Sequence, residues 1–138
     1  MPQDVYEEAA IRQGKTFVWH ELYVPDTEAA VKFYSDVLGF GTEKMDMGEM
    51  GAYTMLTRDG KAVCGMQSTS APQMMPGIPP HWAVYLSVDD VDSRVAAAEN
   101  HGGKLVVPAM DIPTVGRMAL ISDPQGAHIW LFKPNPNM

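Results

Sequence analysis

An acidic residue lies among aromatic residues in the first apolar segment of the chain. Glu21 stands between Trp19 and Tyr23 at alternate positions, so the three side chains would share one face of a strand. An acid in this setting is rarely buried without a partner. We therefore expect a carboxylate that orients a bound ligand, or one whose pKa desolvation raises so that it acts as a general base. The structural alternative is an edge position or a salt bridge.

Two later segments place polar groups beside aromatic rings in the same alternating way. They lie at residues 81–88 and 128–132. The expected ligand cavity is lined by side chains from all three segments: Trp19, Glu21, Tyr23, His81, Tyr85, His128 and Trp130. This lining suits a flat, apolar or aromatic ligand held by a few oriented hydrogen bonds. The plainer interpretation is that the tryptophans fill space between sheets and that His81 begins its strand in solvent.

Short motifs typical of other chemistries do not occur in the sequence. Val24 stands where a zinc-protease motif beginning at His20 would need its second histidine. Gly103-Lys104 lacks the earlier glycine and the following hydroxyl residue of a phosphate-binding loop. The single cysteine, Cys64, excludes a disulfide within the chain and a cysteine-based metal cluster.

The elements that would position the first group of side chains are a strand, a helix and three further strands. Residues 17–24 are rich in aromatic and β-branched residues, which favours a strand. Asp26 or Thr27 is a suitable N-cap for the helix, and Gly39 is suitable for its end. The helix carries one apolar stripe of Ala30, Phe33, Tyr34, Val37 and Leu38. Further strands are expected near 42–47, 52–57 and 62–67, with a hairpin at Asp59-Gly60.

The second half of the chain repeats this plan after a linker. Residues 68–80 contain four prolines and are expected to be irregular. With Met74 and Met75 this linker could form a lid over the cavity or serve only as a loose connection. A strand at 81–88, a helix after Asp90 and strands at 104–110, 117–122 and 128–132 follow, and Pro108 predicts an edge or a bulge. The side chains expected to face the helices are Leu22 and Val24, then Trp82, Val84, Leu86 and Val88, then Ile129 and Leu131.

The agreement between the halves indicates an internal repeat. The matching features are Val24-x-Asp26 with Val88-x-Asp90, Gly39 with Gly103, and Gly60 with Gly126. We therefore predict an α+β fold of two tandem βαβββ modules. The expected boundaries are an N-terminal arm at 1–16, modules at 17–67 and 81–133 joined by the linker at 68–80, and a C-terminal tail at 134–138.

Composition limits the partners of the protein. Hydrophobic residues make up 46% and charged residues 20% of the 138 residues, which is ordinary for a globular domain. The net charge is −7 and basic residues form no run, so nucleic acid is not expected as a partner. No apolar run is long enough for a membrane helix, and the first residues carry acids rather than an apolar signal segment. We expect a cytoplasmic protein.

The repeated segments resemble the vicinal oxygen chelate superfamily. The resemblance is carried by VPDTEAAVKFYSDVLGF, HWAVYLSVDDVDSRVAAAENHGG and ISDPQGAHIWLFKP, and it extends over residues 17–133. The superfamily includes glyoxalase I, extradiol dioxygenases, fosfomycin-resistance enzymes and bleomycin-resistance binding proteins. It implies paired βαβββ modules whose curved sheets enclose a cavity, and often a homodimer. It does not fix the chemistry, because function depends on the site.

The metal positions of the superfamily hold unsuitable residues here. By the resemblance these positions are Trp19, Cys64 or Gly65, Ala83 and Trp130, and none is His or Glu. We therefore expect no metal and no cofactor. A register shifted by two residues would instead bring Glu21, His81 and His128 together as three ligands.

Two functions stay open at this point. The first is a metal-free protein that binds a small aromatic or hydrophobic molecule. The second is an enzyme, a lyase, isomerase or dioxygenase, which uses the shifted metal set or works without metal. In the metal-free enzyme Glu21 would be the general base and Tyr85 or His81 the acid. The sequence does not name the ligand, and it does not say whether the cavity forms within one chain.

Overall fold

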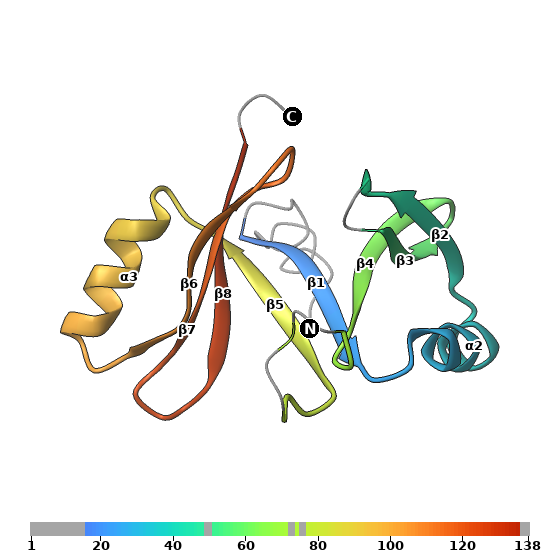
Figure 1. Cartoon of the computed structure of the whole chain (residues 1–138), viewed down its shortest axis with the longest axis horizontal. Coiled ribbons are helices and arrows are strands. Elements are labelled where there is room, and N and C mark those ends of the chain that lie inside the picture. The colour runs from blue at the N-terminus through green and yellow to red at the C-terminus, as the bar shows by residue number, and fades with distance from the viewer. Residues whose placement is uncertain (1–15, 49–50, 72–73, 75–76, 136–138) are drawn as a thin grey trace, which may run out of the picture. The chain divides into compact units, whose positions relative to one another are not determined.

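The computed structural model describes residues 16–48, 51–71, 74 and 77–135. Most of the expected N-terminal arm and C-terminal tail lies outside these residues, as does Met75 of the linker. The elements follow the predicted order (Figure 1): β1 (Phe17–Val24), α2 (Thr27–Leu38), β2 (Gly41–Asp46), β3 (Ala52–Arg58), β4 (Lys61–Ser68), β5 (His81–Ser87), α3 (Val91–Asn100), β6 (Lys104–Ile112), β7 (Gly116–Ser122) and β8 (His128–Pro134). The α+β class with tandem βαβββ modules is therefore confirmed.

The chain divides into two compact units. Among the described residues, the N-terminal unit runs from Trp19 to Ala83, and the C-terminal unit contains residues 84–135 together with residues 16–18. In the N-terminal unit the strand order is β2-β3-β4-β1, with β1 parallel to β4. In the C-terminal unit the order is β5-β8-β7-β6, with β5 parallel to β8. Each unit therefore has the same internal plan.

Helix α2 packs on one face of its sheet. Asp26 caps it by accepting a hydrogen bond from the Ala29 amide at 3.1 Å, and Gly39 ends it with a left-handed φ of 74°. The core under the helix contains Leu22, Ala30, Leu56, Cys64 and Met66, with Val24, Val31, Tyr34 and Phe40 packed against them. The helix-facing assignment of Leu22 and Val24 is confirmed. The predicted stripe is only partly correct, because Phe33, Val37 and Leu38 are half exposed and Val31 packs instead.

Helix α3 packs in the same way in the C-terminal unit. Its core contains Val91, Val95, Ala119 and Leu131, with Leu86, Val88, Ala109 and Ile121 packed against them. This confirms Leu86, Val88 and Leu131 as helix-facing. Strand β6 lies at the outer end of the order, and its pairing with β7 shifts register on both sides of Val107, next to Pro108. The predicted edge or bulge at Pro108 is therefore confirmed.

Trp82 does not face α3 as predicted. It belongs to the N-terminal unit, where its ring meets that of Tyr34 edge-on at 5.5 Å and its Nε1 donates to the Tyr34 hydroxyl at 3.3 Å. The prediction was wrong because β5 begins before the C-terminal unit does, so its first residues pack on α2. Of the helices in the described ranges, none has the length and hydropathy to cross a bilayer.

Candidate functional site

Glu21 lies on the face of β1 that points away from α2. Its neighbour Leu22 is in the core beneath the helix, so strand alternation turns Glu21 to the opposite face. The Glu21 side chain is only 3% exposed. A carboxylate this deep must be satisfied by hydrogen-bond donors or become neutral.

Glu21 has these donors, and two of them are aromatic. Trp19 Nε1 donates to Glu21 Oε2 at 2.8 Å, and the Tyr53 hydroxyl donates to the same oxygen at 2.5 Å. Trp19 Nε1 also lies 3.1 Å from the Tyr53 oxygen, and the Gln67 side chain hydrogen-bonds to Glu21 as well. We call Trp19, Glu21, Tyr53 and Gln67 the carboxylate cluster.

Gly65 makes room for this cluster. It pairs with Glu21 between β1 and β4, and Tyr53 comes from β3 on the other side of β4. A Cβ at Gly65 would overlap the Tyr53 hydroxyl and lie 2.8 Å from Glu21 Oε2. Tyr53 therefore crosses β4 at the one position without a side chain. Sequence reasoning missed Tyr53; a glycine inside a strand was the available signal, since such glycines often mark a close approach.

Burial controls the protonation of the cluster. Desolvation raises the pKa of Glu21, although the hydrogen bonds from Tyr53, Trp19 and Gln67 act in the opposite direction. Burial and the charge of Glu21 also raise the pKa of Tyr53. Tyr53 is therefore the proton donor in the pair and Glu21 is the acceptor. This agrees with the expectation of a partnered, desolvated acid, since the partners of Glu21 are uncharged hydrogen-bond donors rather than the cation of a salt bridge.

Tyr23 and His81 form a second group in the same unit. Their rings stack with centroids 4.9 Å apart and planes 4° apart. His81 Nδ1 lies 2.8 Å from the carbonyl oxygen of Pro79. Tyr23 follows Glu21 on the same face of β1 and pairs with Gln67 of the carboxylate cluster. The sequence-predicted residues Trp19, Glu21, Tyr23 and His81 thus all lie in the N-terminal unit.

The remaining predicted residues lie in the C-terminal unit. Tyr85 is buried and stacks on Trp130 with centroids 5.3 Å apart, and Phe132 meets Tyr85 edge-on at 6.5 Å. His128 is exposed at the first residue of β8. Tyr85 and Trp130 therefore form an aromatic group of their own. That they line one cavity with Trp19 and Glu21 stays a prediction.

The residues at the expected metal positions have other roles. Gly65 rather than Cys64 shares the face of Glu21, which settles the open register, and Cys64 lies in the core, where burial raises the pKa of its thiol to about 11. Trp19 donates to Glu21, and Trp130 stacks on Tyr85. Across the described residues, no group of three or more His, Cys, Asp and Glu side chains is placed to hold a metal ion. The Glu21 carboxylate of the shifted ligand set is occupied by hydrogen-bond donors.

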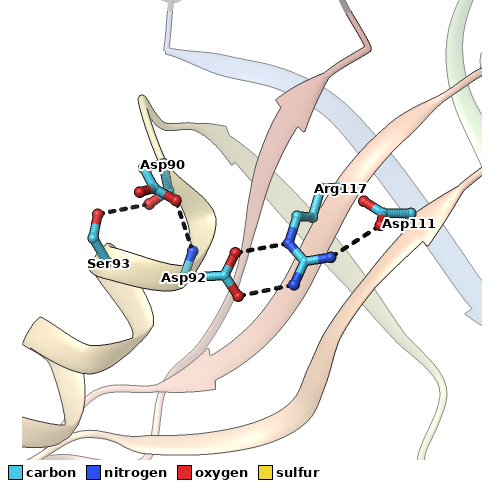
Figure 2. Close-up of polar contacts among 5 residues, drawn as sticks. All are labelled: Asp90, Asp92, Ser93, Asp111 and Arg117. Carbon is cyan, nitrogen blue, oxygen red and sulfur yellow. Dashed lines mark hydrogen bonds and ion pairs between the residues drawn. The ribbon is translucent and has the colours of Figure 1, made fainter.

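A hollow in the C-terminal unit was not anticipated. Its volume is about 330 Å³, and it is lined by Asp111, Ile112, Pro113, Gly116, Arg117, Lys133, Pro134 and Asn135. Arg117 forms two hydrogen bonds with Asp92 of α3, both at 2.8 Å, and one with Asp111 of β6 at 3.1 Å (Figure 2). The Arg117 guanidinium lowers the pKa of Asp92. Both acids neutralise this arginine, so it ties elements together rather than offering a free charge.

Comparison with curated proteins gives two groups of relatives. A Mycobacterium bovis protein with the provisional name glyoxylase CFP32 is 36% identical over 126 residues, covering 91% of this chain and 47% of the relative. The anthracycline biosynthesis protein DnrV of Streptomyces peucetius is 32% identical over 119 residues, covering 79% of this chain and 43% of the relative. The chain thus spans less than half the length of these relatives.

Solved structures share the fold. Methylmalonyl-CoA epimerase from Mycobacterium tuberculosis aligns with a TM-score of 0.61 at 19% identity, covering 89% of each chain. A Streptomyces coelicolor methylmalonyl-CoA epimerase bound to 2-nitronate-propionyl-CoA aligns with a TM-score of 0.59 at 18% identity, covering 87% of this chain and 97% of that one.

The family itself is shown by its sequence profile. The match covers residues 16–131, nearly the whole chain, and so includes both βαβββ modules. This agrees with the expected vicinal oxygen chelate fold. The chain therefore belongs to the Glyoxalase/Bleomycin resistance protein/Dioxygenase superfamily.

Proposed function

We propose that this protein binds a small planar organic molecule, aromatic or hydrophobic, without a metal ion. The observation that carries the proposal is the carboxylate cluster. Trp19 and Tyr53 turn their polar atoms inward to the buried Glu21, and both side chains are only half buried. The part of each ring that stays accessible can contact a ligand, while the hydrogen-bond donors of both side chains are already used. A surface of this kind favours stacking over recognition of charge.

The other predicted residues extend this proposal. Tyr23 and His81 add a stacked pair beside the carboxylate cluster, and Tyr85, His128 and Trp130 are proposed to contact the same ligand. The names of two relatives refer to anthracycline biosynthesis, and anthracyclines are planar polycyclic aromatic compounds. This supports an aromatic ligand. A cytoplasmic location and a homodimer remain part of the proposal, as does the absence of nucleic acid as a partner, in line with the net charge of −7.

A second candidate function is acid–base catalysis, which the 2.5 Å contact between Tyr53 and Glu21 favours. Glu21 itself is 3% exposed, so a substrate would meet Tyr53 first. The Tyr53 oxygen would take a proton from the substrate while its own proton passes to Glu21 Oε2, and the substrate would keep the electron pair. Tyr53 would end neutral and Glu21 protonated, which the raised pKa of Glu21 assists. In this scheme Glu21 acts through Tyr53.

The proposed binding is tested by calorimetric titration with 1-naphthol, 1-methoxynaphthalene and 1-hydroxyanthraquinone. We expect saturable binding of at least one of these compounds with a Kd below about 1 mM. Trp19→Phe should weaken binding about tenfold, the equivalent of about 1.4 kcal/mol, since it removes both the indole face and a donor to Glu21. Trp82→Phe is the matched control, because Trp82 packs on Tyr34 beside α2.

Two outcomes would count against these functions. Failure of all three compounds to bind would contradict the binding function. If a substrate is found, unchanged turnover by Tyr53→Phe would contradict the acid–base alternative and leave binding untouched.

A further inference from the structure

The hydrogen bond from His81 to Pro79 fixes which ring nitrogen carries a proton. A peptide carbonyl oxygen only accepts hydrogen bonds, and the Pro79 oxygen lies 2.8 Å from His81 Nδ1. Nδ1 must therefore be the protonated nitrogen. In the neutral ring Nε2 then carries a lone pair, so it can only accept a hydrogen bond.

The His81 ring is also fixed in orientation. It lies parallel to the Tyr23 ring, with planes 4° apart and centroids 4.9 Å apart. Two consecutive prolines, Pro79 and Pro80, restrict the backbone just before it. The side chain is nevertheless exposed, whereas that of Tyr23 is 7% exposed. His81 therefore presents an oriented acceptor atom at the surface rather than a freely rotating ring.

The position of His81 relates it to the carboxylate cluster. Tyr23, on which His81 stacks, shares a face of β1 with Trp19 and Glu21. Gln67 of β4 pairs with Tyr23, and its side chain hydrogen-bonds to Glu21. The Trp19 and Tyr53 donors point at Glu21. Among the described residues, His81 Nε2 has no partner. It is thus an available acceptor on a face whose aromatic donors are engaged.

We propose that His81 is a specificity-determining residue for aromatic ligands that carry a hydroxyl group. Its Nε2 accepts a hydrogen bond from the O–H at the edge of the planar molecule while the ring system lies against the aromatic side chains. This inference rests on the proposed binding function and narrows its ligand class to phenols and naphthols. A ligand with a neutral donor suits the face better than a ligand with a carboxylate, because the protein has a net charge of −7 and Tyr23, on which His81 stacks, shares its face of β1 with Glu21.

The proton position is tested first, without any ligand. Nitrogen-15 NMR of labelled protein, at a pH where histidines are neutral, should show His81 protonated at Nδ1 and unprotonated at Nε2. His101 is an internal control, since its Nδ1 lies 2.8 Å from the Ala97 carbonyl oxygen and should therefore carry a proton as well. A proton on Nε2 of His81 would overturn the inference.

The ligand preference is tested by calorimetry with 1-naphthol and 1-methoxynaphthalene, which differ in the donor. We expect the wild-type protein to prefer 1-naphthol about tenfold, and His81→Phe to reduce this ratio to about one while 1-methoxynaphthalene still binds. His101→Phe should leave the ratio unchanged. Equal binding of the two compounds by the wild type, or an unchanged ratio in His81→Phe, would overturn the inference but not the binding function. Binding of neither compound, with 1-hydroxyanthraquinone also failing, would overturn both.

Discussion

The two units place different side chains on equivalent strand positions. In the N-terminal unit Glu21 of β1 lies opposite Gly65 of β4, and Tyr53 crosses the gap to reach the carboxylate. In the C-terminal unit Tyr85 of β5 lies opposite Trp130 of β8, and the two rings stack. At these positions the N-terminal unit therefore has a buried carboxylate hydrogen-bonded to aromatic side chains, and the C-terminal unit has aromatic side chains alone. The same backbone plan thus supports a hydrogen-bonded carboxylate in one unit and a pair of stacked aromatic rings in the other.

Met118 of β7 stands at the position that Tyr53 holds in β3. Tyr53 lies two residues before Met55, the partner of Gly65, and Met118 lies two residues before Leu120, the partner of Trp130. Trp130 stands in the C-terminal unit where Gly65 stands in the N-terminal unit, so an indole replaces the absent side chain of the glycine. The hydrogen bond between Tyr53 and Glu21 in the N-terminal unit therefore depends on the absence of a side chain at Gly65.

The largest expected effect comes from closing the gap at Gly65. Gly65→Ala places a Cβ where the Tyr53 hydroxyl lies, so the cluster must break and the free energy of unfolding should fall by about 3 kcal/mol. Urea unfolding measures the change. Adding Tyr53→Ala removes the obstructing ring, so Gly65→Ala should cost much less in that background. Equal costs in both backgrounds would show that the contact between Tyr53 and Gly65 is not the cause.

Removing the Tyr53 hydroxyl should have the next largest effect. Tyr53→Phe leaves the buried Glu21 without one of its donors, so the free energy of unfolding at neutral pH should fall by about 2 kcal/mol. Tyr34→Phe is the matched control, since the Tyr34 hydroxyl accepts a 3.3 Å hydrogen bond from Trp82 at the surface rather than donating to a buried carboxylate. Similar losses in the two variants would mean that the hydrogen bond from Tyr53 to Glu21 stabilises the fold no more than a surface hydrogen bond does.

The pH dependence of stability should separate Glu21 from other acids. Its pKa is raised in the folded protein above 4.5, so the folded state holds this proton more tightly than the unfolded state. The stabilising contribution is complete below pH 4.5 and is lost as the pH rises through the folded-state pKa. Urea unfolding of wild type and Glu21→Gln across this window should show wild type losing stability relative to the variant as pH rises. A difference that stays constant, or that changes in the opposite direction, would contradict the desolvated carboxylate.

The smallest effect is expected at the ion pairs of Arg117. Asp92→Asn weakens contacts of 2.8 Å, but the acid is largely exposed and solvent screens its charge, so the free energy of unfolding should fall by much less than in Tyr53→Phe. Thermal unfolding in low and high salt measures this, and the loss should shrink in high salt. A loss as large as that of Tyr53→Phe would mean that the C-terminal unit also depends on a polar network.

Local sequence signals predicted the elements and most helix-facing residues. The N-cap residues Asp26 and Asp90, whose side chains accept hydrogen bonds from the amides of Ala29 and Asp92, were sufficient for this together with alternation in β1, because they act within a few residues. They also identified Glu21 as an acid in need of partners. Its partner Trp19 was within reach of the same reasoning, since the two share one face.

The rest of the site depends on pairing between distant strands. Tyr53 reaches Glu21 only because β3 and β4 pair in a particular register, with a shift between Leu56 and Thr57. The choice between Cys64 and Gly65 also depended on register, because a slip of one residue exchanges the two faces of a strand. Trp82 was misassigned because alternation gives the face of a side chain but not the helix that covers it.

The central claim is that the carboxylate cluster contacts an aromatic ligand without a metal ion. It is tested most directly in Trp82→Phe/Trp130→Phe, which keeps Trp19 as the one tryptophan. Fluorescence of Trp19 would be followed during titration with 1-hydroxyanthraquinone, with and without a chelator and with added Zn²⁺, Mn²⁺ or Ni²⁺. Our account predicts saturable quenching that neither chelator nor metal changes and that Tyr53→Ala weakens. Quenching that appears only with a divalent metal, or no quenching at all, would contradict it.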